Sequence, residues 1–168
     1  MVRVMRKSIL YVVVTVMALS AFGAAAQQRT KENVWRLKYE NTLTNGLHAL
    51  KRQEFEKAFN LLSESAKWGD KQAQFFLAQM YFNGWYVEQD YQIGWLWINV
   101  ALEQRDAEWA TAYNRIKQAL PEEFVTAMEP LVEQHIAEYG AEAKDLNCRK
   151  IAATGSNIRE TRCEKRFY

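Results

Sequence analysis

The residues of this chain best suited to chemistry are two cysteines and two histidines. Three roles are open to Cys148 and Cys163 from their residue type: a redox pair, two ligands of a metal site, or a disulfide. Many residues separate them, whereas a redox pair usually has two intervening residues, and a metal site needs three or four ligands. His48 and His135 have no neighbouring nucleophile or ligand, and no hydrolase, zinc-peptidase or phosphate-loop motif is present. The sequence therefore predicts no enzymatic activity, no metal and no cofactor.

The first 26 residues predict the compartment, because they resemble a secretory signal peptide. A basic start is followed by an apolar run over residues 8–23 and then by small residues. The basic residues are Arg3, Arg6 and Lys7, and the small ones are Ala24, Ala25 and Ala26. A retained membrane anchor is the alternative, although the run is short for a span of about 20 residues. We expect cleavage near Ala26 and a periplasmic or secreted chain, where cysteines form disulfides.

The segment between the cysteines predicts a β-hairpin. Gly155-Ser156 is a favoured two-residue turn of type II′, with glycine first. That register places Ile151 opposite Glu160 and Cys148 directly opposite Cys163, with Cα atoms about 4.5–5.5 Å apart. A disulfide closing about 15 residues contributes about 3 kcal/mol in the chain-entropy model. Because an isolated two-stranded hairpin is marginal in water, this crosslink would matter.

The charge is unevenly distributed along the chain. Residues 27–143 carry 12 Lys and Arg against 17 Asp and Glu, a net charge of −5, whereas residues 144–168 carry seven against three. The body is not basic enough to favour nucleic acid as a partner. The basic tail is either a solvated segment or a region attracted weakly to an anionic envelope surface.

Residues 31–140 predict an almost wholly helical region with an internal repeat. Phe55, Ala58 and Asp70 of one segment correspond to Tyr91, Gly94 and Asp106 of the next. Glycines are expected to end helices, and aspartates to cap the helices that follow. We expect helices over about 32–50, 54–68, 71–83, 90–104, 106–119 and 121–139, the last passing through Pro130.

The second segment carries a recognisable pattern. Its positions are Ala73, Leu77-Ala78, Tyr81, Gly84, Val87, Asp90-Tyr91, Gly94, Trp97, Ala101 and Asp106. This pattern resembles the Sel-one-like repeat (SLR) family, which is related to tetratricopeptide repeats, and the resemblance covers about residues 45–106. The tail also resembles a C-terminal element of small exported proteobacterial proteins, from which no role can be transferred. The SLR resemblance implies an adaptor or scaffold that binds other proteins.

The sequence departs from the family pattern at two places. Gly94 stands where the family usually has alanine, which should weaken its helix by about 1 kcal/mol. Trp85-Tyr86 replaces a glycine-containing connector, so we expect this connector to run differently.

One face of the helix over residues 71–83 is the candidate binding surface. Its residues Gln72, Phe75, Gln79 and Phe82 lie beside a stripe expected to be core, formed by Ala73, Phe76, Leu77, Met80 and Tyr81. Exposed phenylalanines flanked by glutamines would suit an extended peptide, with Trp85 and Tyr86 completing the set. The alternative, which the sequence favours, is that Phe75 and Phe82 pack in the core.

The sequence therefore predicts an all-α chain with a short α-solenoid of helix-turn-helix repeats and a C-terminal disulfide-closed β-hairpin. Residues 1–26 are the expected signal peptide, residues 27–140 the repeat domain and residues 141–168 the basic tail with the hairpin. The predicted function is an exported adaptor or scaffold for protein–protein interaction in the bacterial envelope. The alternative is a binder that docks through its basic tail on anionic lipid or cell-wall polymer.

Overall fold

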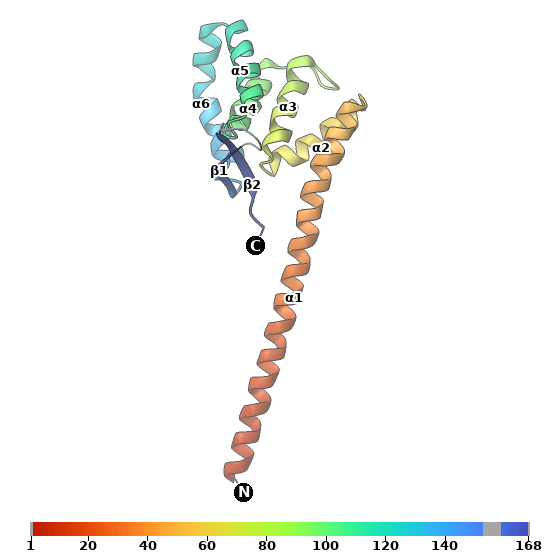
Figure 1. Cartoon of the computed structure of the whole chain (residues 1–168), viewed down its shortest axis with the longest axis vertical. Helices are drawn as coiled ribbons and strands as arrows, with labels where there is room; N and C mark the ends of the chain where they lie inside the picture. The colour runs from red at the N-terminus through yellow and green to blue at the C-terminus, as the bar shows by residue number, and fades with distance from the viewer. Residues whose placement is uncertain (1, 153–158, 168) are drawn as a thin grey trace. The chain divides into compact units, whose positions relative to one another are not determined.

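The structure, a computed structural model, describes residues 2–152 and 159–167, with side chains described over 27–152 and 160–167. Its elements are α1 (Val2–Lys51), α2 (Phe55–Lys67), α3 (Lys71–Asn83), α4 (Tyr91–Ala101), α5 (Ala107–Ala119), α6 (Glu122–Tyr139), β1 (Leu146–Ala152) and β2 (Arg159–Lys165) (Figure 1). The predicted fold class, a helical repeat with a terminal hairpin, is confirmed.

The chain divides into two compact units. The first comprises the described residues up to Lys38 together with Phe167, and the second spans Tyr39–Arg166. The prediction that the first helix begins near residue 32 is wrong, because α1 extends back to Val2. Residues 2–31 contain no proline, so nothing in this stretch forces a helix to end. Within the described residues, no helix is both long enough and apolar enough to cross a membrane.

Aspartates begin three successive helices of the second unit, as predicted. The side chain of Asp70 accepts a hydrogen bond from the backbone N–H of Ala73 at 2.8 Å, and Asp90 accepts one from Ile93 at 2.9 Å. Asp106 serves α5 in the same way. Each carboxylate satisfies a backbone donor that the first turn of a helix leaves without an intrahelical partner.

The core of the second unit forms where α3 packs between α2 and α4 (Figure 1). Small residues allow the helices to approach closely, and large apolar side chains fill the remaining space. The fully buried members include Ala58, Leu62, Ala66, Ala73, Leu77, Ala78, Met80, Ile98, Val100 and Ala101.

The connector between α3 and α4 keeps a positive-φ turn without the family's second glycine. Gly84 ends α3 in the left-handed region at φ 65°, as predicted. Tyr86 then adopts φ 73°, in the region that non-glycine residues rarely occupy. Backbone hydrogen bonds from Trp85 to Met80 and from Asp90 to Tyr81, both 3.0 Å, hold the connector. The predicted difference in path from the family connector stays a prediction, and Tyr86 carries the strain that glycine would avoid.

Gly94 has a packing role that its helix propensity does not reveal. A Cβ atom at this position would lie 2.7 Å from Cε1 of Phe82, closer than such atoms approach in proteins. The ring of Phe82 occupies the space that an alanine methyl group would need. The alanine of the family pattern would therefore require the ring of Phe82 to shift.

The C-terminal segment forms the predicted hairpin. α6 continues through Pro130, and β1 pairs antiparallel with β2 so that Ile151 faces Glu160 and Cys148 faces Cys163. The two cysteines form a disulfide with their Cα atoms 3.9 Å apart, closer than predicted. The predicted turn at Gly155-Ser156 lies outside the described residues.

The hairpin contacts the loop that follows α4 and the turn that follows α6. The backbone N–H of Cys163 donates to the Gln104 side chain at 3.3 Å, and the N–H of Leu146 donates to the carbonyl of Ala141 at 2.8 Å. The side chain of Leu146 is buried. β1 is therefore anchored at its start and β2 at its centre.

Candidate functional site

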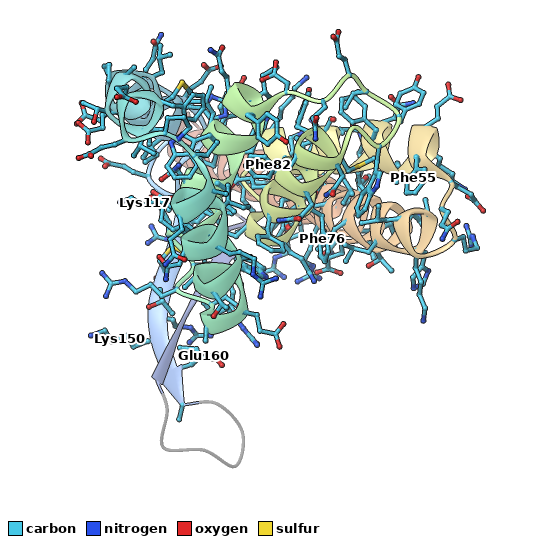
Figure 2. The ribbon with its side chains drawn as sticks, turned by 90° about the horizontal axis from the view of Figure 1, so that it is seen from above. Phe55, Phe76, Phe82, Lys117, Lys150 and Glu160 are labelled. Carbon is cyan, nitrogen blue, oxygen red and sulfur yellow. A yellow bond between two sulfur atoms is a disulfide. The ribbon has the colours of Figure 1, made fainter. Side chains whose placement is uncertain are left out.

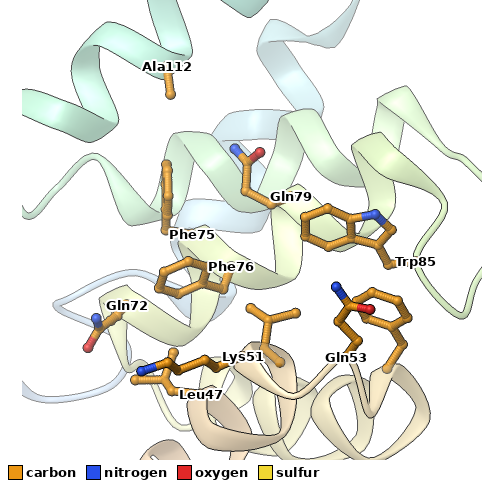
Figure 3. A pocket seen from close by; sticks show the side chains of 11 residues that line it. Leu47, Lys51, Gln53, Gln72, Phe75, Phe76, Gln79, Trp85 and Ala112 are labelled. Carbon is orange, nitrogen blue, oxygen red and sulfur yellow. The ribbon is translucent and has the colours of Figure 1, made fainter.

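The second unit has a mainly apolar groove of about 660 Å³, named here the aromatic groove (Figure 3). The C-terminal turns of α1 and the start of α2 form one wall, and α3 forms the other. Its lining residues are Leu47, Leu50, Lys51, Gln53, Phe55, Gln72, Phe75, Phe76, Gln79, Trp85 and Ala112.

Helical periodicity builds the α3 wall. Gln72, Phe75, Phe76 and Gln79 occupy positions i, i+3, i+4 and i+7 of α3, which lie on one face of a helix. The two aromatic rings therefore lie between two amide side chains, which Figure 3 shows at different levels along the helix. This wall combines a broad apolar surface with hydrogen-bonding groups along its length.

Aromatic contacts fix the shape of the groove at two places. The rings of Phe55 and Trp85 stack with centroids 5.5 Å apart. Phe75 stacks on Trp109 at 4.9 Å and meets Phe76 edge-on at 5.5 Å. Offset and edge-to-face aromatic pairs favour particular ring orientations, so these side chains are positioned before any partner arrives.

The polar part of the lining is made of amides and one ammonium group. Gln53, Gln72 and Gln79 each offer both a donor and an acceptor. Lys51 supplies a positive charge, and none of the described lining residues carries a carboxylate. Chemically, the groove can hold large apolar side chains and hydrogen-bond a peptide backbone beside them.

The groove brings together four of the six predicted partner-binding residues. Gln72, Phe75, Gln79 and Trp85 line it, although Phe75 is only 9% exposed and belongs also to the core. Their role in binding stays a prediction, which the structure supports by placing them together. Phe76, which was predicted to be core, is half-buried and lines the groove.

The other two predicted residues lie outside the groove. Phe82 is 8% exposed and fills the space beside Gly94, as expected for a core residue. Tyr86 is 52% exposed, and its hydroxyl donates a hydrogen bond to Glu56 at 3.3 Å. The nearby negative charge of Glu56 raises the pKa of this phenol.

Sequence reasoning missed the opposite wall. None of its residues, Leu47, Leu50, Lys51, Gln53 and Phe55, is among the predicted partner-binding residues. Gln53 takes φ 61°, which reverses the chain sharply and sets Phe55 against Trp85. The sequence signal for this wall was the short connector itself, which places both helix ends beside α3.

A buried polar network, also not predicted from the sequence, joins the start of α3 to Glu103. The ammonium group of Lys71, which is 2% exposed, donates to Glu103 at 2.6 Å and to Gln74 at 3.0 Å. The same carboxylate of Glu103 accepts from the backbone N–H of Ala141 at 2.8 Å. Burial lowers the pKa of Lys71, while the Glu103 carboxylate opposes that shift. Because the partners are supplied, the buried charge is compensated.

Neither histidine lies in the aromatic groove. His135 lies between aromatic rings, 4.5 Å from Trp97 and 4.7 Å from Tyr139 between centroids, and burial lowers its pKa. His48 is exposed on α1. Among the side chains described over residues 27–152 and 160–167, no three His, Cys, Asp or Glu lie close enough together to hold a metal ion.

Ion pairs neutralise part of the basic tail. Arg149 pairs with Glu164 across the hairpin at 3.0 Å, and Arg166 pairs with Asp145 at 3.4 Å. Lys144 lies 5.0 Å from the centre of the Tyr139 ring. The exposed Lys150 lies on β1, where the hairpin extends beyond the helices (Figure 2).

Comparison with known proteins gave a structural match. No family model matches the sequence. No curated protein matches it either. The fold is similar to the crystal structure of a protective antigen present in uropathogenic Escherichia coli strains and displaying an SLR fold, with 25% sequence identity and a TM-score of 0.52. The match covers 69% of this chain but only 27% of the antigen.

This structural likeness agrees with the SLR-like sequence pattern over about residues 45–106. Together with the helical architecture, it supports an SLR-like family, as the sequence pattern predicted. Such repeats typically act as non-catalytic scaffolds in protein–protein interaction. The disulfide is consistent with an oxidising location outside the cytoplasm.

Proposed function

We propose that this protein is an exported helical-repeat scaffold whose aromatic groove binds an extended segment of another protein. The observation that carries the proposal is the groove itself. Pre-positioned rings of Phe55, Trp85 and Phe76 offer apolar surface, and glutamine amides lie beside them. Apolar pockets bordered by groups that hydrogen-bond a peptide backbone are a recurring means of peptide recognition.

The proposed location is the periplasm or the exterior of a bacterial cell. A signal peptide over residues 1–26, cleaved near Ala26, would direct the chain there. The Cys148–Cys163 disulfide supports this, since such bonds persist in oxidising compartments. The scaffold role includes no catalytic step, in keeping with the usual role of this fold.

Docking on anionic lipid or cell-wall polymer through the basic tail receives less support. Two of the tail's arginines are engaged with carboxylates of the same tail, which reduces the positive charge available to an anionic surface. Salt also screens the attraction between exposed side chains and an anionic surface, so any such attraction would be modest.

Site-specific photocrosslinking in living cells tests the proposed function. A benzophenone amino acid at Gln72, which is exposed on the groove wall, should form an adduct with a partner protein. The same group at Gln118, exposed on α5 and not among the groove residues, is the matched control. The adduct should disappear in the Trp85→Ala variant, provided that circular dichroism shows its helices intact. No adduct from position 72, or the same adduct from position 118, would contradict the proposal.

A further inference from the structure

The charge of the aromatic groove differs from that of the body around it. Residues 27–143 carry a net charge of −5, yet the groove lining contains one cation and no carboxylate among its described residues. An acidic segment approaching most of this surface would meet net repulsion. At the groove it would meet only amides, apolar side chains and the ammonium group of Lys51.

Lys51 is free to meet a partner's charge. It is exposed in the last turn of α1, and Figure 3 shows it beside Leu47 at the edge of the groove, on the same side as Gln72. The nearest acid along the chain, Glu54, is already engaged with Arg52 at 2.7 Å and Lys57 at 3.8 Å. Among the residues that the structure describes, Lys51 has no carboxylate partner.

The apolar part of the groove lies directly beside this cation. Leu47, Leu50 and Phe76 line the groove together with Lys51, and Figure 3 shows Lys51 beside Leu47 with Trp85 farther along the groove. An extended peptide advances by about 3.3 Å per residue, so neighbouring positions of one segment can meet both features. The geometry thus requires apolar and acidic side chains close together in the ligand.

We infer that the aromatic groove recognises an extended peptide with large apolar side chains next to a carboxylate, the apolar groups against Phe55, Phe76 and Trp85 and the carboxylate at Lys51. This inference rests on the proposed function and specifies its ligand. The amides of Gln72 and Gln79 hydrogen-bond the peptide backbone, so affinity depends on apolar burial and the preference for acid depends on Lys51.

A displayed library of random twelve-residue peptides tests both the proposed function and the inferred ligand. The library is selected in parallel on the full chain and on its Trp85→Ala variant. Peptides enriched only on the unaltered chain are groove-dependent. We expect them to combine Leu, Phe, Trp or Tyr with Asp or Glu within three positions, and to be depleted in Lys and Arg. Groove-dependent peptides without acidic enrichment would overturn the inference and leave the proposed function standing. If no groove-dependent peptide emerges, both are overturned.

A charge reversal then assigns the preference to one side chain. Binding of the best acidic peptide, followed by fluorescence anisotropy, should weaken about fivefold or more in Lys51→Glu, and the loss should shrink at high salt. Lys150→Glu makes the same change of charge on the hairpin, away from the groove (Figure 2), and should leave the affinity unchanged. Equal losses in both variants would show a general charge effect and overturn the assignment to Lys51.

Discussion

Replacing Gly94 with alanine tests whether the ring of Phe82 dictates a glycine in α4. By helix propensity alone, alanine should raise the free energy of unfolding by about 1 kcal/mol. The structure predicts the opposite sign. The new Cβ would lie 2.7, 2.8 and 3.0 Å from three atoms of the Phe82 ring, which is 8% exposed and has little room to move.

The magnitude follows from two opposing terms. Overpacking a well-packed site typically costs about 1–3 kcal/mol, so it exceeds the gain in propensity. We expect Gly94→Ala to lower the free energy of unfolding by about 1 kcal/mol. In a Phe82→Ala background the ring is absent, and the same substitution should raise stability by about 1 kcal/mol. Phe82→Ala alone should cost about 3–5 kcal/mol.

Urea denaturation, followed by circular dichroism, gives the free energies of unfolding of the unaltered chain, the two single variants and the double variant. Together these four proteins form a double-mutant cycle. The expected coupling between Gly94 and Phe82 is about 2 kcal/mol, well above the scatter for independent sites. Gln92→Gly and Gln92→Ala, at an exposed position of the same helix, supply the propensity difference without the clash. A stabilising Gly94→Ala in the unaltered background, or an additive cycle, would refute the reasoning.

Three further predictions concern the hairpin, the connector and the half-buried His135. Thiol titration of the denatured, oxidised protein should find no free thiol, and Cys148→Ser with Cys163→Ser should lower hairpin stability by about 3 kcal/mol, seen as faster amide exchange in β1 and β2. Tyr86→Gly should be about 1 kcal/mol more stable than Tyr86→Ala in urea denaturation, because both remove the ring but only glycine relieves the positive φ; equal stabilities would contradict this strain. Burial holds the pKa of His135 below 6.5, so the unfolded chain binds more protons in acid, and stability should fall as pH drops from about 6.5 through the folded-state pKa. His135→Gln should flatten that part of the pH profile, and an unchanged slope would exclude His135 as its source.

The features predicted best from the sequence depend on neighbouring residues. Asp70 and Asp90 cap the helices that follow them, and Gly84 ends α3, because caps involve atoms only a few positions apart. The hairpin register was predictable for the same reason, since pairing across a short turn leaves few choices. These local signals do not depend on how the rest of the chain packs.

The sequence of α3 alone does not determine which of its two apolar faces is buried in the core. Phe75 and Phe76 are adjacent on α3, and each continues an apolar row. Which row is core depends on where the neighbouring helices lie. Trp109 of α5 stacks on Phe75, and that contact directs Phe76 towards the groove. The binding role of the predicted stripe stays a prediction, and Gln72, Phe75 and Gln79 of that stripe line the groove.

Long-range polar contacts were beyond sequence reasoning. Lys71 lies in a helix start that resembles an ordinary exposed position, and its partner Glu103 is 32 positions away. Gln74 donates to the carbonyl of Tyr139, 65 positions away. Periodicity describes which positions are apolar, but it carries no information on which buried polar groups will find one another.

The network around Gln74 has a consequence for the modularity of the repeat. Its amide donates to the carbonyls of both Ala66 and Tyr139, at 3.0 Å each, so one side chain joins the ends of α2 and α6. Repeat units in longer solenoids can often be exchanged, because each contacts only its neighbours. Here, excising α6 would remove the Tyr139 carbonyl and leave the Gln74 amide without one of its two acceptors. The repeat is thus fitted to this particular terminus, and a chimaera that transplants it would need to carry α6 along.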